Sequence, residues 1–109
     1  MQCEQYKIVV INLDPTVVAE IQKKRLCVIV SPNEMNQNLQ TITICPITSK
    51  SHAYPTRIEF ELEGQTNWIV IDQIRTLDKS RISEARSPLQ LDEDTIEQVK
   101  SVIKQTFVD

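Results

Sequence analysis

Six polar side chains stand where strand-like apolar runs begin or end. In chain order they are Arg25, Thr48, Ser49, Asp72, Gln73 and Arg75. If a sheet carrying these runs curls into a barrel, its strand ends can converge on one rim. A guanidinium there donates charge-assisted hydrogen bonds that strengthen as negative charge develops on a phosphodiester, and a threonine hydroxyl adds a neutral donor. The pattern therefore permits phosphate chemistry.

Each of these side chains also has a purely structural interpretation. Thr48 and Ser49 could form the turn that ends a strand. Asp72 could cap the turn that follows it, and Arg75 could pair with Asp78 at the surface. The basic residues before the second apolar run could be a solvated flank that discourages aggregation. The residue types alone leave both interpretations open.

Other chemistries are poorly supplied by this sequence. His52 is the single histidine, so one chain cannot provide an acid–base pair of imidazoles, and its polar loop indicates a solvated side chain. The sequence has no HExxH, no CxxC and no glycine-rich phosphate loop, so neither a metal nor a cofactor is expected. Cys3, Cys27 and Cys45 are odd in number and well separated, which favours core thiols in a reducing compartment.

Length and composition predict one folded domain over residues 1–109. Hydrophobic residues make up 40% of the chain and charged residues 25%, as is typical of globular domains. The net charge of −3 arises in residues 92–109, where five acidic side chains face two lysines. Since no basic leader precedes an apolar stretch and no apolar run is long enough for a bilayer, we expect a cytoplasmic protein without membrane contact.

The pattern of apolar residues predicts a mainly β fold. Strands are expected over residues 6–13, 25–30, 41–47, 54–62 and 67–71, with a weakly paired last strand over 81–86. Within the third run, Pro46 indicates a sheet edge or a bulge. The fourth and fifth runs are expected to form a hairpin around Gly64, the only glycine in the chain.

Helical signals are fewer. Short helical turns are expected at 31–36 and 78–81, and Asp92 is the expected N-cap of an amphipathic helix over 91–107. The apolar face of that helix consists of Ile96, Val99, Val102, Ile103 and Phe107. Strands followed by one closing helix predict an antiparallel, strongly twisted sheet or small barrel with a C-terminal helix, not a βαβ fold.

A series of motifs resembles one known family. The motifs are 12–16 (NLDPT), 28–32 (VIVSP), 46–50 (PITSK), 54–55 (YP), 72–82 (DQIRTLDKSRI) and 91–93 (LDE). In this order and spacing they resemble the MazF/PemK (Kid) family of toxins. The resemblance implies an SH3-like barrel shared with CcdB, a homodimer, and a toxin of a toxin–antitoxin system. It further implies a sequence-specific endoribonuclease that cleaves single-stranded mRNA without metal, the ribose 2′-hydroxyl attacking the adjacent phosphate to leave a 2′,3′-cyclic phosphate.

The same resemblance implies roles for individual residues. Arg25 matches the family's catalytic arginine and Thr48 the threonine that holds the scissile phosphate. Asp72 falls where the Kid branch has an aspartate proposed as a base. Because an arginine stays protonated, an electrostatic role is preferred for Arg25, and the proton acceptor is left open. RNA contacts are expected from Lys23, Lys24, Ser49, Lys50, Gln73 and Arg75.

The partner implied by the resemblance is a MazE-like antitoxin. Such antitoxins present an extended, often acidic segment that folds on binding, and the basic residues Lys23, Lys24, Arg25 and Arg75 are its expected receivers. An alternative hypothesis is a binding module without catalysis, since residues 18–26 (VAEIQKKRL) lack the glycines and the proline of the family pattern. A CcdB-like gyrase poison is more remote, because the chain ends 107–109 (FVD) rather than Trp-Gly-Ile.

Overall fold

The β-branched runs of the sequence form an antiparallel sheet in the computed structural model, which describes residues 3–12 and 24–108. Within these residues the strands are β1 (Lys7–Asn12), β2 (Lys24–Ile29), β3 (Thr41–Thr48), β4 (Arg57–Leu62), β5 (Gln65–Val70), β6 (Arg75–Asp78) and β7 (Ile82–Gln90). The helices are α1 (Asn33–Asn38) and α2 (Glu93–Ile103), with short helical turns η1 (Ile71–Gln73), η2 (Lys79–Arg81) and η3 (Lys104–Val108).

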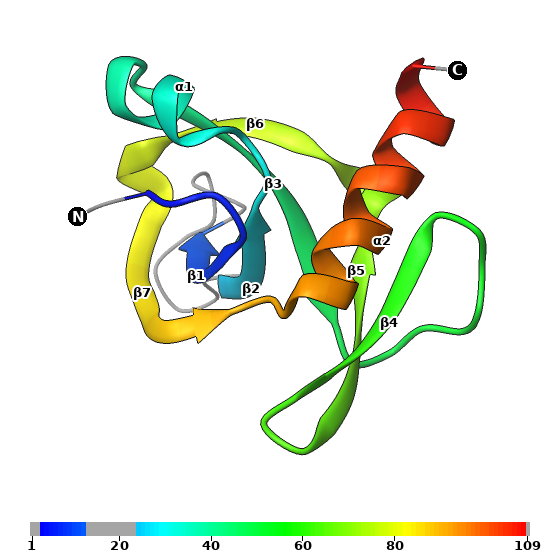
Figure 1. Cartoon of the computed structure of the whole chain (residues 1–109). Helices are drawn as coiled ribbons and strands as arrows, with labels where there is room; N and C mark the ends of the chain where they lie inside the picture. The colour runs from blue at the N-terminus through cyan, green and yellow to red at the C-terminus, as the bar shows by residue number, and fades with distance from the viewer. Residues whose placement is uncertain (1–2, 13–23, 109) are drawn as a thin grey trace.

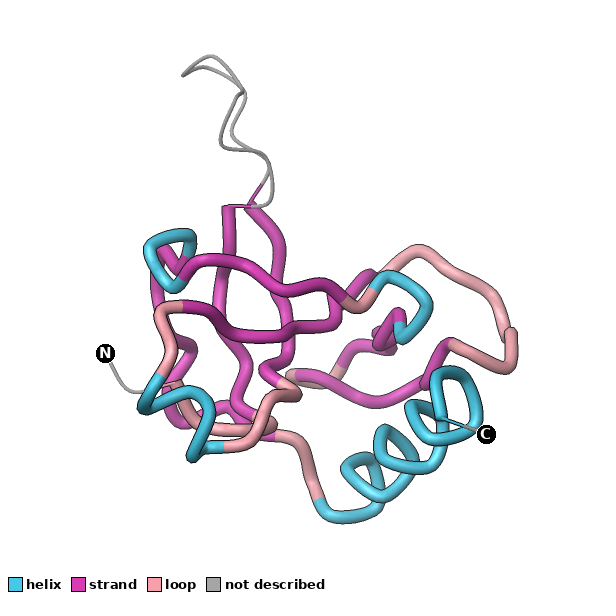
Figure 2. The backbone as a smooth tube through the Cα atoms, turned by 90° about the horizontal axis from the view of Figure 1, so that it is seen from above, coloured by secondary structure: helices cyan, strands magenta, loops and turns pink. Residues whose placement is uncertain are grey.

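The sheet is long and curled. Its strand order is β4-β5-β3-β2-β1-β7, and β6 pairs with the first half of β3. The outer strands β6 and β7, joined by η2, bend around β1, β2 and β3, while the β4–β5 hairpin projects beside α2 (Figures 1 and 2). The prediction of a mainly antiparallel, small barrel-like fold with a C-terminal helix is confirmed, and the sheet curls without closing. No helix in the described part of the chain is long and apolar enough to cross a membrane.

Two apolar cores occupy the two faces of the sheet. Successive side chains of a strand point to opposite faces, so along β2 Val28 enters one core and Cys27 and Ile29 enter the other. The first core is covered by α2, which contributes Val99. The second lies inside the curl of β1, β2, β3 and β6. Because both faces are buried, β2 reads as a continuous apolar run rather than an alternating one.

The expectation of an edge at Pro46 was wrong. β3 is a central strand, with β2 along one side and β6 followed by β5 along the other. On that second side, pairing with β6 ends at Ile44 and pairing with β5 begins at Ile47. Pro46 therefore lies in the gap between two partner strands, where a missing backbone N–H leaves the ladder intact.

Two other boundaries differ from the prediction. β6 was not predicted as a strand, because its polar residues give no apolar alternation beyond Leu77, which alone enters the core. The last strand runs to Gln90 rather than Arg86 and pairs with β1 at the edge of the sheet. The hairpin between β4 and β5 is confirmed, and Gly64 provides the positive φ of its turn at 79°.

The helix cap was predicted correctly and the helix end was not. The Asp92 carboxylate accepts from the backbone N–H of Thr95 at 2.8 Å, and hydrogen bonds from Thr95 hold the pKa of Asp92 below its usual value. The α-helix ends at Ile103, and Phe107, expected on the buried face, is 53% exposed. The three cysteines are free thiols, of which Cys27 and Cys45 are buried as predicted.

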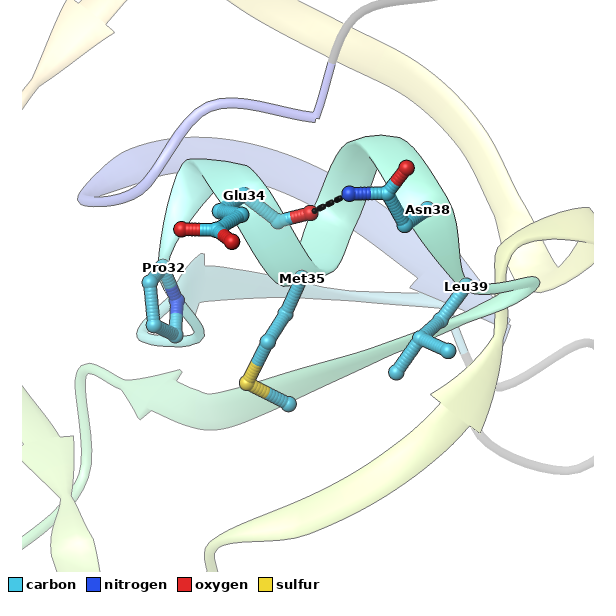
Figure 3. A pocket seen from close by; sticks show the side chains of 5 residues that line it. All are labelled: Pro32, Glu34, Met35, Asn38 and Leu39. Atoms are coloured by element: carbon cyan, nitrogen blue, oxygen red, sulfur yellow. Dashed lines mark hydrogen bonds between the residues drawn. The ribbon is translucent and has the colours of Figure 1, made fainter.

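A shallow hollow lies on the outer face of α1. Its volume is about 430 Å³ and its walls are mainly apolar, with the side chains of Met35 and Leu39 exposed to solvent (Figure 3). The Asn38 amide donates to the carbonyl of Glu34 at 2.7 Å and closes the short helix. None of the residues that line this hollow is basic and none is a predicted site residue, so the candidate site lies elsewhere.

Candidate functional site

A second hollow forms where β2 begins and β3 ends. Its volume is about 380 Å³, and it is lined by Lys24, Arg25, Leu26, Ile47, Thr48, Ser49, Lys50 and Asn67. We call it the Arg25 hollow. It brings together both residues implied to act on the phosphate and three of those implied to contact RNA. Its lining is more polar than apolar and includes three basic residues, which suits it to an anionic group such as the phosphate of a nucleotide.

Strand pairing explains why Arg25 and Thr48 share this hollow. In the ladder between β2 and β3, Cys27 pairs with Pro46. Continuing this register by two residues places Arg25 opposite Thr48. Residues two apart on a strand face the same side, and directly opposite residues face each other's side chains. The two side chains therefore extend from one face of the sheet, just beyond the point where the β2–β3 ladder ends.

The guanidinium of Arg25 is available to a ligand. The residue is exposed, and across residues 3–12 and 24–108 its side chain forms no hydrogen bond or ion pair. Burial raises the pKa of the Cys27 thiol to about 12, while the positive charges of Arg25 and Arg75 act in the opposite direction. Arg25 shares a strand face with Cys27, and Arg75 shares one with Leu77, so both arginines lie on the face of the sheet that forms the second core.

The hydroxyl of Thr48 helps to form the turn after β3. Its Oγ1 accepts from the backbone N–H of Lys50 at 3.1 Å, and the distance from Oγ1 to the Lys50 carbonyl is 3.5 Å. The turn-forming interpretation is therefore correct. It does not exclude a phosphate contact, because a hydroxyl proton held at 3.5 Å is weakly bonded and can rotate toward a stronger acceptor.

Asp72 is not among the residues that line the Arg25 hollow. It lies in η1, where its carboxylate accepts from Thr56 Oγ1 at 2.8 Å and from Arg57 Nε and Nη2 at 3.4 Å each. Burial tends to raise the pKa of Asp72, but the hydrogen bonds from Thr56 and Arg57 and the charge of Arg57 outweigh it, so the pKa is lowered. The Asp72 carboxylate therefore binds Thr56 and Arg57 instead of capping the turn that follows it.

The other predicted residues are placed as follows. Lys24, Ser49 and Lys50 are exposed in the Arg25 hollow, whereas Gln73 is exposed on η1. Arg75 is exposed and does not pair with Asp78, whose carboxylate instead accepts from the Ser80 backbone N–H at 2.8 Å. Lys23 and most of residues 18–26, on which the alternative hypothesis depends, lie outside the described residues.

Sequence reasoning missed several residues around the site. Leu26, Ile47 and Asn67 line the hollow but belong to strands whose residues were read only as core. Arg57 was not among the predicted site residues, yet it binds Asp72 and also donates through Nη1 to Ser51 Oγ at 3.0 Å. A lone cation at the start of a strand otherwise lined by glutamates was the available signal.

The fold has close structural relatives. MazF from Deinococcus radiodurans aligns with a TM-score of 0.75 at 23% identity, covering 94% of this chain and 93% of that one. A MazE–MazF complex from the same organism aligns at 0.80 and 21%, covering 96% and 95%. An endoribonuclease in complex with its cognate antitoxin from Mycobacterial species aligns at 0.78 and 16%, covering 94% and 91%.

The sequence itself matches a family model over nearly its whole length. Among curated protein sequences no match was found. The family model for PemK-like, MazF-like toxins of type II toxin–antitoxin systems matches residues 4–107. With its motifs in family order and a fold that superposes on MazF, the chain belongs to the PemK/MazF family of toxins of type II toxin–antitoxin systems.

Proposed function

We propose that this toxin is an endoribonuclease that cleaves single-stranded mRNA without a metal ion. The observation that carries the proposal is the Arg25 hollow, where the Thr48 hydroxyl shares one exposed, basic pocket with a guanidinium that has no ion pair within the described part of the chain. Structural neighbours described as endoribonucleases share the fold of this chain, which supports the proposal. Lys24, Ser49 and Lys50 line the same pocket and are proposed to contact the RNA backbone.

The proposed reaction is an internal transesterification. The 2′-oxygen of the ribose forms a bond to the adjacent phosphorus, the bond from phosphorus to the 5′-oxygen breaks, and a 2′,3′-cyclic phosphate results. Arg25 stabilises the extra negative charge of the phosphorane, and Thr48 donates a hydrogen bond to a non-bridging oxygen. The 2′-hydroxyl loses a proton and the leaving 5′-oxygen gains one. Arg25 is not the acceptor, because its guanidinium stays charged.

The proposal extends to partners. We expect a homodimer that binds single-stranded RNA, and a MazE-like antitoxin whose acidic segment competes for the unpaired cations. Lys24, Arg25 and Arg75 are exposed and form no ion pair within the described part of the chain. Their positive field is suited to either an RNA backbone or an acidic peptide. Binding of the antitoxin is therefore expected to weaken as salt concentration rises.

The test is cleavage of a long single-stranded RNA by purified protein in EDTA. The expected products carry 2′,3′-cyclic phosphate ends, and Arg25→Ala is expected to abolish most of the activity. RNA that stays intact would overturn the proposal and support the binding module without catalysis, which is then expected to bind antitoxin without arresting growth. Cleavage of equal strength by Arg25→Ala would also overturn the proposal, because the reaction would then not depend on Arg25.

A further inference from the structure

Four polar side chains form a cluster next to the Arg25 hollow. They are Ser51, Thr56, Arg57 and Asp72, which we call the Arg57 clamp. Arg57 begins β4, Asp72 lies in η1 beyond β5, and Ser51 lies in the connection between β3 and β4. The cluster thus joins three segments that are separate in sequence. It is centred on one guanidinium, whose flat fork of donors can contact two groups at once.

The contacts divide the guanidinium between two partners. Nε and Nη2 each lie 3.4 Å from a different carboxylate oxygen of Asp72, and Nη1 lies 3.0 Å from Ser51 Oγ. Thr56 Oγ1 completes the cluster by donating to Asp72 at 2.8 Å. Backbone bonds support the same place, because Ile71 N–H donates to the Thr56 carbonyl at 2.9 Å. Arg57 is therefore held by the carboxylate of Asp72 and contacts Ser51 in the connection between β3 and β4 at the same time.

That connection begins with residues of the Arg25 hollow. Thr48, Ser49 and Lys50 line the hollow, and Ser51 follows directly. At its start the connection is fixed by the bond from Lys50 N–H to Thr48 Oγ1. Three residues beyond Thr48 it is fixed by Arg57, and within the described residues no other side chain from outside the connection bonds to 49–53. The two bonds together determine where Ser49 and Lys50 stand relative to Thr48.

We propose that Arg57 is a positioning residue of the toxin, which holds the β3–β4 connection so that Ser49 and Lys50 face the phosphate bound at Arg25 and Thr48. This inference rests on the proposed ribonuclease function. Asp72 then serves as the anchor of Arg57, and not as the base. Asp72 does not line the Arg25 hollow, and both of its carboxylate oxygens accept from Arg57, which makes it a weaker base than a free carboxylate.

The first test measures the connection without any need for activity. Amide hydrogen exchange of residues 49–53 is compared between the wild type, Arg57→Ala and Arg57→Lys. A lysine keeps the charge but cannot contact Asp72 and Ser51 together. Exchange is expected to rise about threefold to tenfold in both variants, as for the loss of one or two partly exposed hydrogen bonds. Glu61→Ala is the matched control, because Glu61 lies on the same strand as Arg57 and the change removes an exposed contact with Thr66 of β5.

The second test measures RNA. Arg57→Ala is expected to weaken binding of a 2′-O-methyl RNA about threefold to tenfold and to raise KM more than it lowers kcat. Arg57→Ala and Asp72→Asn combined are expected to lose no more than either alone, because both break one unit. Unchanged exchange and unchanged RNA affinity in Arg57→Ala would overturn the positioning role of Arg57 and leave the ribonuclease proposal intact. Faster exchange in Arg57→Ala, combined with a wild type that does not cleave RNA, would support the clamp and overturn the ribonuclease proposal.

Discussion

The Arg25 hollow and the Arg57 clamp share the connection between β3 and β4, yet they use their charges differently. In the hollow, Lys24, Arg25 and Lys50 carry positive charges with no counter-ion among residues 3–12 and 24–108. In the clamp, the guanidinium of Arg57 and the carboxylate of Asp72 are bonded to each other. Exposed charges of one sign are solvated but repel one another, and an anionic ligand relieves this repulsion, whereas the paired charge already has its counter-ion in the protein.

The difference teaches which polar groups are free to act on a substrate. Residue type and motif position make both Arg25 and Asp72 candidates for catalysis. Their contacts differ. Within the described residues Arg25 has no ion-pair partner, whereas Asp72 is bonded to Arg57. A carboxylate in an ion pair is a weaker base than a free one, since its protonated form loses the attraction. Four variants test this contrast.

The largest effect is expected from Arg25→Ala. Removing a charged donor aimed at a developing oxyanion typically costs about 100-fold to 1000-fold in rate, and the exposed side chain contributes little to folding. Single-turnover cleavage of RNA in EDTA measures the loss. Lys100→Ala, which removes an equal charge from the exposed face of α2, is expected to keep the wild-type rate.

Thr48→Val is expected to have the next largest effect. Valine preserves the shape of the side chain but removes the hydroxyl, so cleavage is expected to fall about tenfold to 100-fold, the value of a hydrogen bond to a charged group. Thr48→Ser keeps the hydroxyl and is expected to stay within a few-fold of the wild type. Equal losses in the two variants would show that the methyl group, and not the hydroxyl, matters.

Lys50→Ala is expected to change affinity more than rate. If Lys50 neutralises one RNA phosphate, its loss reduces the slope of log affinity against log salt by about 0.7 for a single strand. Titration of a 2′-O-methyl RNA at several salt concentrations measures the slope, since this RNA lacks the attacking hydroxyl. An unchanged slope would remove Lys50 from the phosphate contacts.

The smallest effect is expected in acid stability. The pKa of Asp72 lies below its usual value of 3.8 in the folded chain, so its ion pair stabilises the fold above that pH and is lost as the pH falls through the folded pKa. Thermal unfolding between pH 6 and pH 2 is expected to show a shallower loss in Asp72→Asn than in the wild type. Glu63→Gln, a change in the exposed hairpin turn, serves as the control for removal of a carboxylate.

Local sequence signals predicted the elements that bury an apolar face. The alternation of residues 56–62, the glycine at position 64 and the cap at Asp92 each act over a few residues, and the structure follows them. Pro46 and β6 were misread because both depend on where distant strands stop. No local pattern reveals that one partner of β3 ends at Ile44 and the next begins at Ile47.

The site residues also divide into those that the sequence predicts and those that depend on distant contacts. Arg25 and Thr48 were found as a pair because motif order encodes them, and the register of β2 and β3 places them together. The bond between Arg57 and Asp72 joins residues 15 apart through the β4–β5 hairpin. Its geometry depends on side-chain rotamers and on the η1 turn, which a list of residue types does not specify.

The most direct test of the account compares Arg25→Ala with Asp72→Asn on one RNA, in EDTA, under single-turnover conditions. Arg25→Ala is expected to reduce the single-turnover cleavage rate about 100-fold or more. Asp72→Asn disturbs only the anchor of Arg57 and is expected to reduce the rate less than about tenfold. If Asp72→Asn instead loses as much as Arg25→Ala while Arg57→Ala stays active, Asp72 acts on the substrate directly. That result would contradict the assignment of the free and the paired charges.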